Sequence, residues 1–224
     1  MNLPAFSAKI DEDLYQSYLK DLLLGNRHQC FQFLEEELKR GRSLKSVYLD
    51  LMQRALNEVG SLWERNLISV ATEHLASSTT ETLLARIYPL MFLQPHKDLR
   101  AIISCVPDEQ HQIGSRMVAD FFELHGWHGY HLGANTPVAA LLHMIRDRDP
   151  DIVGLSMSML FNLPKLEEML AAITAEFPEL ALLIGGRAFL GEGGQVARNK
   201  LVRRFAQLHY FATLDELEEY LLNV

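Results

Sequence analysis

Residues 99–114 read Leu99-Arg100-Ala101-Ile102-Ile103-Ser104-Cys105-Val106-Pro107-Asp108-Glu109-Gln110-His111-Gln112-Ile113-Gly114. The apolar first half is typical of a buried strand, and a helical pattern follows at once. A strand that ends in a polar loop, with a glycine opening the next helix, is where an α/β sheet usually binds its ligand. A lone histidine in such a loop is more often an ordinary residue than a ligand, so His111 by itself indicates little.

Strand-like and helix-like segments alternate along the rest of the chain, after a linker marked by Pro95. We predict strands over residues 100–106, 127–132, 152–157, 181–184 and 209–212, and helices over 112–125, 137–146, 163–177, 195–205 and from Leu214 onward. Five strands that alternate with helices predict a parallel, doubly wound sheet with the flavodoxin-like order 2-1-3-4-5.

The first part of the chain shows only helical periodicity. Helices are expected over residues 11–24, 28–39, 43–65 and 69–88, with Ser43 and Ser69 as N-caps and Gly25 as a stop. Four amphipathic helices with short connections predict a four-helix bundle. The sequence therefore predicts a helical domain over 1–94 and a Rossmann-like domain over 95–224.

Composition excludes several classes of protein. The 224 residues carry a net charge of −8 and dispersed basic residues, so direct binding of nucleic acid is not expected. The apolar stretches are too short to span a membrane. Cys30 and Cys105 lie in apolar elements without a C-x-x-C motif, and no signal peptide is apparent at the N-terminus, which indicates buried, reduced thiols in a cytoplasmic protein.

Common nucleotide and hydrolase motifs are missing. No G-x-G-x-x-G follows the first predicted strand, and neither a P-loop, an H-E-x-x-H nor a G-x-S-x-G occurs. What remains is a set of residues at three strand ends: His111, then Ser156 after residues 115–155, then Gly185-Gly186 after residues 159–184. Those strand ends are neighbours at the point where the predicted sheet order reverses, which is the expected ligand crevice.

These residues and spacings resemble the cobalamin-binding domain family. Its pattern is Asp/Glu-x-His-x-x-Gly, then Ser-x-Leu, then Gly-Gly, and here Glu109, His111, Gly114, Ser156 and Gly185-Gly186 take those positions. One departure is a serine at position 158 where the family usually has leucine. Taken singly, the same residues could form a helix-capping loop, an ordinary strand end and an ordinary βα turn.

The resemblance implies a role for each residue. His111 would bind cobalt from below in place of the cofactor's own base, and neutral imidazole suits such a metal. Glu109 would orient the imidazole. Ser156 would hydrogen-bond the displaced base, and Gly185 and Gly186 would allow the backbone to approach the nucleotide tail. The cofactor implied is cobalamin, with adenosylcobalamin favoured over methylcobalamin and hydroxocobalamin.

The helical part carries a second pattern, Trp63 followed after nine residues by Glu73-His74. It resembles the light-sensing, MerR-type regulators that bind adenosylcobalamin, in which a bundle covers the upper face of the corrin. That resemblance implies that Trp63, Glu73 and His74 contact the upper axial group, and that His74 could reach cobalt. The alternatives are a bundle-core aromatic for Trp63 and an ordinary first turn for the pair. Glu64 stands where those regulators place a second histidine.

Two functions follow from the resemblance. The favoured one is a stand-alone cobalamin sensor, a photoreceptor or ligand-responsive adaptor in transcription regulation or other signal transduction, because no winged-helix segment precedes the bundle. It would act on a protein partner such as a regulator or kinase and is compatible with a homo-oligomer. The alternative is a corrinoid methyl-carrier subunit that serves a methyltransferase. Either would be a sensor or carrier rather than a catalyst on its own.

A third hypothesis is haem in the same cleft, but haem has no nucleotide tail for Ser156 and the glycine pair to bind. The other histidines are isolated or lie on different faces, and we predict no functional role for His125, His128 or His131.

Overall fold

The computed structural model describes residues 10–93 and 95–223. The expectation about a signal peptide concerns the first residues, of which 1–9 lie outside this range. The chain divides into two compact units, Met1–Pro89 and Leu90–Val224, with the division slightly earlier than the predicted boundary near residue 95. Among the described residues, no helix combines the length and apolar character needed to cross a membrane.

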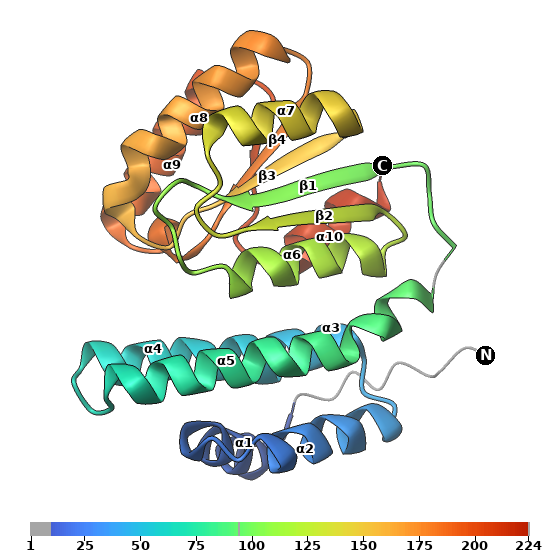
Figure 1. The fold of residues 1–224 in the computed structure, drawn as a ribbon, viewed down its shortest axis with the longest axis vertical. Helices are drawn as coiled ribbons and strands as arrows, with labels where there is room; N and C mark the ends of the chain where they lie inside the picture. The colour runs from blue at the N-terminus through green and yellow to red at the C-terminus, as the bar shows by residue number, and fades with distance from the viewer. Residues whose placement is uncertain (1–9, 94, 224) are drawn as a thin grey trace. The chain divides into compact units, whose positions relative to one another are not determined.

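The first unit is helical, as predicted (Figure 1). Its elements are α1 (Glu12–Leu24), α2 (Arg27–Lys39), α3 (Leu44–Ser46), a π-helix (Val47–Gln53), α4 (Arg54–Glu64) and α5 (Val70–Ile87), followed by a 3₁₀ segment (Tyr88–Leu93). The hydroxyls of Ser43 and Ser69 accept hydrogen bonds from the first turns of α3 and α5, so both predicted N-caps are confirmed. Gly25 ends α1 with a φ of 71°.

The predicted third helix, 43–65, differs from the structure in its middle. Residues Val47–Gln53 form a π-helix between α3 and α4 rather than continuing as α-helix. Val47, Leu51 and Met52 are fully buried there, so the wider turn still directs apolar side chains inward. Periodicity at a spacing of three and four residues does not distinguish the two helix types, which is why the sequence did not reveal the change.

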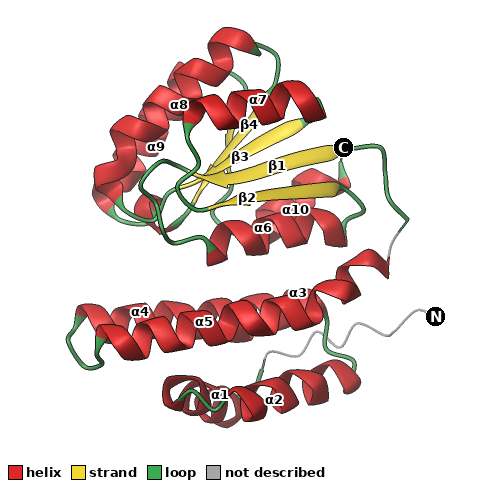
Figure 2. Ribbon diagram, in the orientation of Figure 1, coloured by secondary structure: helices red, strands yellow, loops and turns green. Residues whose placement is uncertain are grey.

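The second unit is the predicted α/β domain (Figure 2). Its strands are β1 (Arg100–Cys105), β2 (His128–Gly133), β3 (Ile152–Ser156), β4 (Ala181–Gly185) and β5 (Leu208–Tyr210), and its helices are α6 (Ile113–Leu124), α7 (Val138–Arg148), α8 (Leu163–Glu176), α9 (Glu192–Arg204) and α10 (Leu214–Leu222). All strand pairs are parallel, and the order is β2-β1-β3-β4-β5, which confirms the predicted topology. β5 is shorter than the predicted strand, and α9 begins earlier than predicted.

The sheet is covered on both faces. Helices α7, α8 and α9 lie on one face and α6 and α10 on the other (Figure 1). A buried cluster joins the first face to the sheet and includes Ile102, Val153, Leu170, Ile184 and Leu201. Both cysteines are free and buried, as expected. With its faces covered, the sheet leaves its carboxyl edge as the place where loops can form a site.

Candidate functional site

Glu109 lies in the loop between β1 and α6 and is almost completely buried, at 1% exposure. Its Oε1 accepts hydrogen bonds from Nδ1 of His111 at 2.5 Å and from the backbone N–H of the same residue at 3.1 Å. Its Oε2 accepts from the backbone N–H groups of Ser158 and Met159 at 2.8 and 3.1 Å, and from Nδ2 of Asn162 at 3.5 Å. Every neighbour is a donor, so the site is built for a carboxylate.

These donors decide the charge of Glu109. Burial alone would raise its pKa, but the hydrogen bonds from the His111 side chain and from the backbone N–H groups of Ser158 and His111 together lower the pKa to about 2. An ionised Glu109 accepts hydrogen bonds only, and therefore requires a hydrogen on Nδ1 of His111. In neutral imidazole the lone pair is then on Nε2.

His111 is positioned as a ligand would need to be. Its side chain is 46% exposed, and its Nε2 has no hydrogen-bond partner among the residues that the structure describes. The carboxylate thus holds one ring nitrogen while the other remains available to a metal.

The loop that carries this pair is also fixed from the side of β2. The backbone N–H of Asp108 donates to Oδ1 of Asn135 at 2.9 Å, and the backbone N–H of Asn135 donates to the carbonyl of Glu109 at 3.0 Å. Asp108 also forms an ion pair with Lys165 of α8. The β1–α6 loop is therefore bound to the loops after β2 and β3, around the strand-order reversal.

Ser156 and the glycine pair lie on adjacent strands beside this loop. Ser156 pairs with Gly185 in the register of β3 and β4, and its hydroxyl has no hydrogen-bond partner within the described ranges. A Cβ on Gly185 would meet no atom within 4 Å, so open space adjoins it. Gly186 differs: its φ is 109°, and a Cβ would overlap the carbonyl oxygen of Met157. Its conformation alone therefore requires glycine.

Gly114, the remaining glycine of the pattern, lies in the first turn of α6. A Cβ at this position would meet nothing within 4 Å, so local packing does not require glycine there.

A hydrogen-bonded cluster that the sequence did not reveal, formed by Ser115, His131 and Cys105, adjoins the loop that carries His111. The Ser115 hydroxyl is 2.9 Å from Nε2 of His131 and 3.2 Å from Sγ of Cys105, and it donates to the carbonyl of Gln112 at 2.7 Å. Asn162 and the backbone N–H groups of the β3–α8 loop were missed as well. Hydrogen bonds between distant loops leave no spacing signal, although a polar Ser115 at the start of an apolar helix was a usable hint.

The predicted site residues Trp63, Glu73 and His74 lie on α4 and α5 of the helical unit. Trp63 lies at the end of α4 and is 45% exposed, so it is not a core aromatic. Glu73 and His74 are in the first turn of α5, where Nδ1 of His74 is 2.6 Å from Oε2 of Glu73. Oε1 of Glu73 accepts from the Ser77 hydroxyl at 2.9 Å. The Glu73–His74 pair thus repeats the arrangement of Glu109 and His111, in a more exposed setting.

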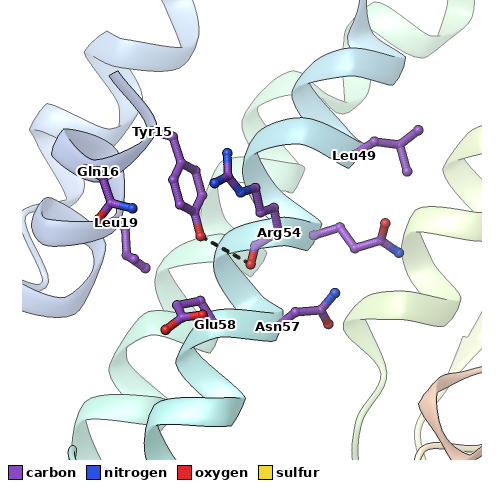
Figure 3. A pocket seen from close by; sticks show the side chains of 8 residues that line it. Tyr15, Gln16, Leu19, Leu49, Arg54, Asn57 and Glu58 are labelled. Atoms are coloured by element: carbon purple, nitrogen blue, oxygen red, sulfur yellow. Dashed lines mark hydrogen bonds between the residues drawn. The ribbon is translucent and has the colours of Figure 1, made fainter. Parts of the chain in front are cut away.

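The helical unit also contains a cavity of about 560 Å³ between α1, the π-helix and α4 (Figure 3). Two of its polar groups have partners: Arg54 lies over the ring of Tyr15 at 3.6 Å and bonds Glu12 at 2.6 Å, and the Tyr15 hydroxyl donates to the Arg54 carbonyl at 3.4 Å. The cavity is lined by Tyr15, Gln16, Leu19, Leu49, Gln53, Arg54, Asn57 and Glu58. It contains none of the predicted site residues.

Two family models match this chain. Residues 99–200 match the B12 binding domain family, and residues 14–88 match a second family with the same description. This chain carries a B12-binding domain in both its helical and its α/β part. It is therefore a cobalamin-binding protein.

Two curated relatives are longer than the region that matches this chain. It is 28% identical over 156 residues to the HTH-type transcriptional repressor CarH of Myxococcus xanthus, covering 69% of this chain and 51% of that protein. It is 29% identical over 188 residues to the methionine synthase of Mycobacterium tuberculosis, covering 78% of this chain and 15% of that enzyme. The chain thus spans about half the length of CarH and a small part of methionine synthase.

Among solved structures, the Methanosarcina barkeri monomethylamine corrinoid protein has a similar fold. The TM-score is 0.79 with 12% sequence identity, over 95% of this chain and 98% of that one. At this identity the likeness establishes the fold: a helical part followed by a five-stranded parallel α/β domain.

Proposed function

We propose that this chain is a corrinoid carrier, which binds cobalamin with His111 as the lower ligand of cobalt and carries a methyl group between partner proteins. The observation that carries the proposal is the Glu109–His111 pair. A buried carboxylate takes one ring nitrogen and leaves the other free at a half-exposed position. Bound cobalamin would supply the cobalt that accepts and releases the methyl group.

The α/β unit has features that fit the cofactor. The free Nε2 of His111 suits a transition metal. The unpartnered hydroxyl of Ser156 could bond the displaced base, and the open space beside Gly185 could receive the nucleotide tail. These features lie at the carboxyl edge of neighbouring strands, where doubly wound sheets bind nucleotides.

The chain's own residues prepare the ligand before it binds. Glu109 stays ionised through its five hydrogen bonds, so it holds the hydrogen on Nδ1 and directs the lone pair of Nε2 outward. Because the same carboxylate is bonded to the β3–α8 loop, the imidazole is held in one orientation rather than sampling several. Such preorganisation lowers the conformational cost of binding.

Two observations favour a carrier over a light sensor. Glu64 occupies the position of the second histidine of the light-sensing regulators, so the chain lacks the imidazole that takes cobalt there. The chain also shares the fold of the Methanosarcina barkeri monomethylamine corrinoid protein over 98% of that chain, whereas it spans 51% of CarH.

A cobalamin-dependent sensor remains the second candidate, because one observation favours it. Trp63, Glu73 and His74 match the pattern of the light-sensing regulators, and the similarity to CarH spans 69% of this chain. In this function Trp63 would contact the upper axial group. His74, with Nδ1 held by Glu73, would offer Nε2 as an upper ligand.

The two candidates are distinguished by titrating the cofactor-free chain with hydroxo-, methyl- and adenosylcobalamin in darkness, then illuminating with green light. A carrier binds all three comparably, keeps its size on illumination, and releases the methyl group to an added thiol acceptor. A sensor prefers adenosylcobalamin and changes its size on illumination. His111→Ala should lose the spectrum of histidine-ligated cobalamin, whereas His143→Ala, an exposed control on α7, should keep it. Failure of the native chain to bind any corrinoid would reject both functions.

A further inference from the structure

The hydrogen-bonded cluster of Ser115, His131 and Cys105 connects three elements through one hydroxyl. Ser115 lies in the first turn of α6, Cys105 ends β1 and His131 lies near the end of β2. The Ser115 hydroxyl donates its single hydrogen to the carbonyl of Gln112 at 2.7 Å. It must therefore act as acceptor toward Nε2 of His131 at 2.9 Å, which makes that ring nitrogen the donor.

Both carbonyl groups that this network reaches belong to the turn that carries the candidate cobalt ligand. Gln112 accepts from Ser115, and the carbonyl of His111 itself lies 3.8 Å from the Cys105 thiol. Gln112 also accepts, through its side-chain Oε1, the backbone N–H of Ala134 just after β2 at 3.2 Å. The turn at 111–112 is thus held by hydrogen bonds to Ser115 and Ala134, in addition to the bonds between Glu109 and His111.

The strand pairing brings His131 to this position. The register of β1 and β2 shifts between Ile103, which pairs with His131, and Ser104, which pairs with Gly133. Leu132 is therefore left without a partner in β1, and such an irregularity re-aims the neighbouring side chains. Burial, with a smaller effect of Arg116, lowers the pKa of His131 to about 4. The ring is then neutral at physiological pH.

We propose that His131 is a positioning residue: by donating to Ser115 it fixes the 111–112 turn, and so sets where the imidazole of His111 meets cobalt. This inference rests on the proposed cobalamin ligation by His111. It assigns His131 no contact with the cofactor, and its effect passes through Ser115.

The test compares His131→Leu, which removes the donor, with His131→Gln, which keeps an N–H, and with Ser115→Ala. Each cofactor-free variant is first checked for folding by circular dichroism and then titrated with hydroxocobalamin. We expect the Leu and Ala variants to bind about tenfold more weakly, as for one lost hydrogen bond, with part of the bound cobalamin no longer histidine-ligated. His131→Gln should restore most of the native spectrum.

A double variant, His131→Leu with Ser115→Ala, should bind no more weakly than either single one, because both changes break the same link. Fully additive losses, or a native spectrum in His131→Leu, would overturn the inference. If the His131 variants do not fold, Ser115→Ala set against Ser115→Thr, which keeps the hydroxyl, decides it.

Failure of the proposed function gives a different pattern. The native chain would then show no histidine-ligated spectrum, or His111→Ala would keep it. If instead His111→Ala loses the ligation while all His131 and Ser115 variants retain it, the proposed function stands and this inference falls. His143→Leu controls for removing an exposed histidine.

Discussion

The backbone N–H of Ser158, in the loop after β3, donates a 2.8 Å hydrogen bond to the carboxylate of Glu109, in the loop after β1. Those two strands are adjacent at the centre of the sheet. The bond therefore joins the two loops that flank the candidate site, and it ties the orientation of His111 to the position of the β3–α8 loop. A histidine held in this way should respond to changes on either strand.

Replacing Glu109 by glutamine tests this relationship. The amide N–H₂ of Glu109→Gln would face N–H donors wherever it is placed, so one set of hydrogen bonds must be lost. We expect the free energy of unfolding to fall by about 1–3 kcal/mol and the histidine-ligated spectrum to weaken. Chemical denaturation and cobalamin titration measure the two effects. Glu179→Gln, on the surface, should change neither; an unchanged spectrum in Glu109→Gln would contradict the orienting role.

Stability should fall on acidification in two successive windows that overlap slightly near pH 4. The pKa of His131 is lowered from 6.5 to about 4, chiefly by burial, so its neutral form is the one that folding favours. Its contribution to stability is present above pH 6.5 and is lost as the pH falls toward 4. Glu109, with a pKa near 2, contributes above pH 4.5 and loses that contribution between 4.5 and 2.

The first window can be isolated by comparing the native chain with His131→Gln, which does not titrate. The difference between their free energies of unfolding should shrink by about 1–3 kcal/mol from pH 6.5 to 4. The charged and titratable neighbours are Arg116 and the Cys105 thiol, whose pKa burial raises. A difference that is constant over this range would show that His131 is not held neutral.

The adjacent glycines 185 and 186 should behave differently. Gly186→Ala places a Cβ against the Met157 carbonyl at a φ of 109°, and we expect it to cost about 1–3 kcal/mol of stability. Gly185→Ala enters open space, so the free energy of unfolding should change by less than about 0.5 kcal/mol. Its cobalamin affinity should nevertheless drop, since the methyl group would enter the space proposed for the tail. Equal affinity would remove Gly185 from the site.

Glu64→His tests the sensor hypothesis by gain of function. Glu64 is exposed next to Trp63, so the change should leave the fold intact. If the helical unit otherwise retains a light-sensing arrangement, the variant loaded with adenosylcobalamin should give a cobalt spectrum with two histidine ligands after green light. Glu58→His, earlier on α4, serves as the control. A photoproduct identical to that of the native chain would weigh further against a sensor.

The order of elements and the sheet topology could be predicted from the sequence, because the hydrophobic period changes between the two parts and the strands alternate with helices. The carboxyl-edge location of Glu109 and His111 followed from that topology. The local helix type could not be predicted everywhere. The buried positions 47, 48, 51 and 52 fit an α-helix as well as a single π turn, so the seven residues Val47–Gln53 carried no distinguishing signal.

The supporting hydrogen bonds could not be predicted. Asn162 and Ser158 reach Glu109 across about fifty positions of chain, and the Ser158 bond uses a backbone N–H that any residue would supply. His131 was set aside because the histidines near it lie on different faces. Its role depends on the register shift beside Ile103, which sequence periodicity does not encode.

The π-helix Val47–Gln53 sets the angular phase of everything that follows it on the same continuous helical run, including Trp63. Because a π turn closes i→i+5 hydrogen bonds where an α turn closes i→i+4, it accommodates one more residue in the same turn. A homologous chain that is one residue shorter within 47–53 should therefore form an ordinary α-helix there and still present its tryptophan in the same direction.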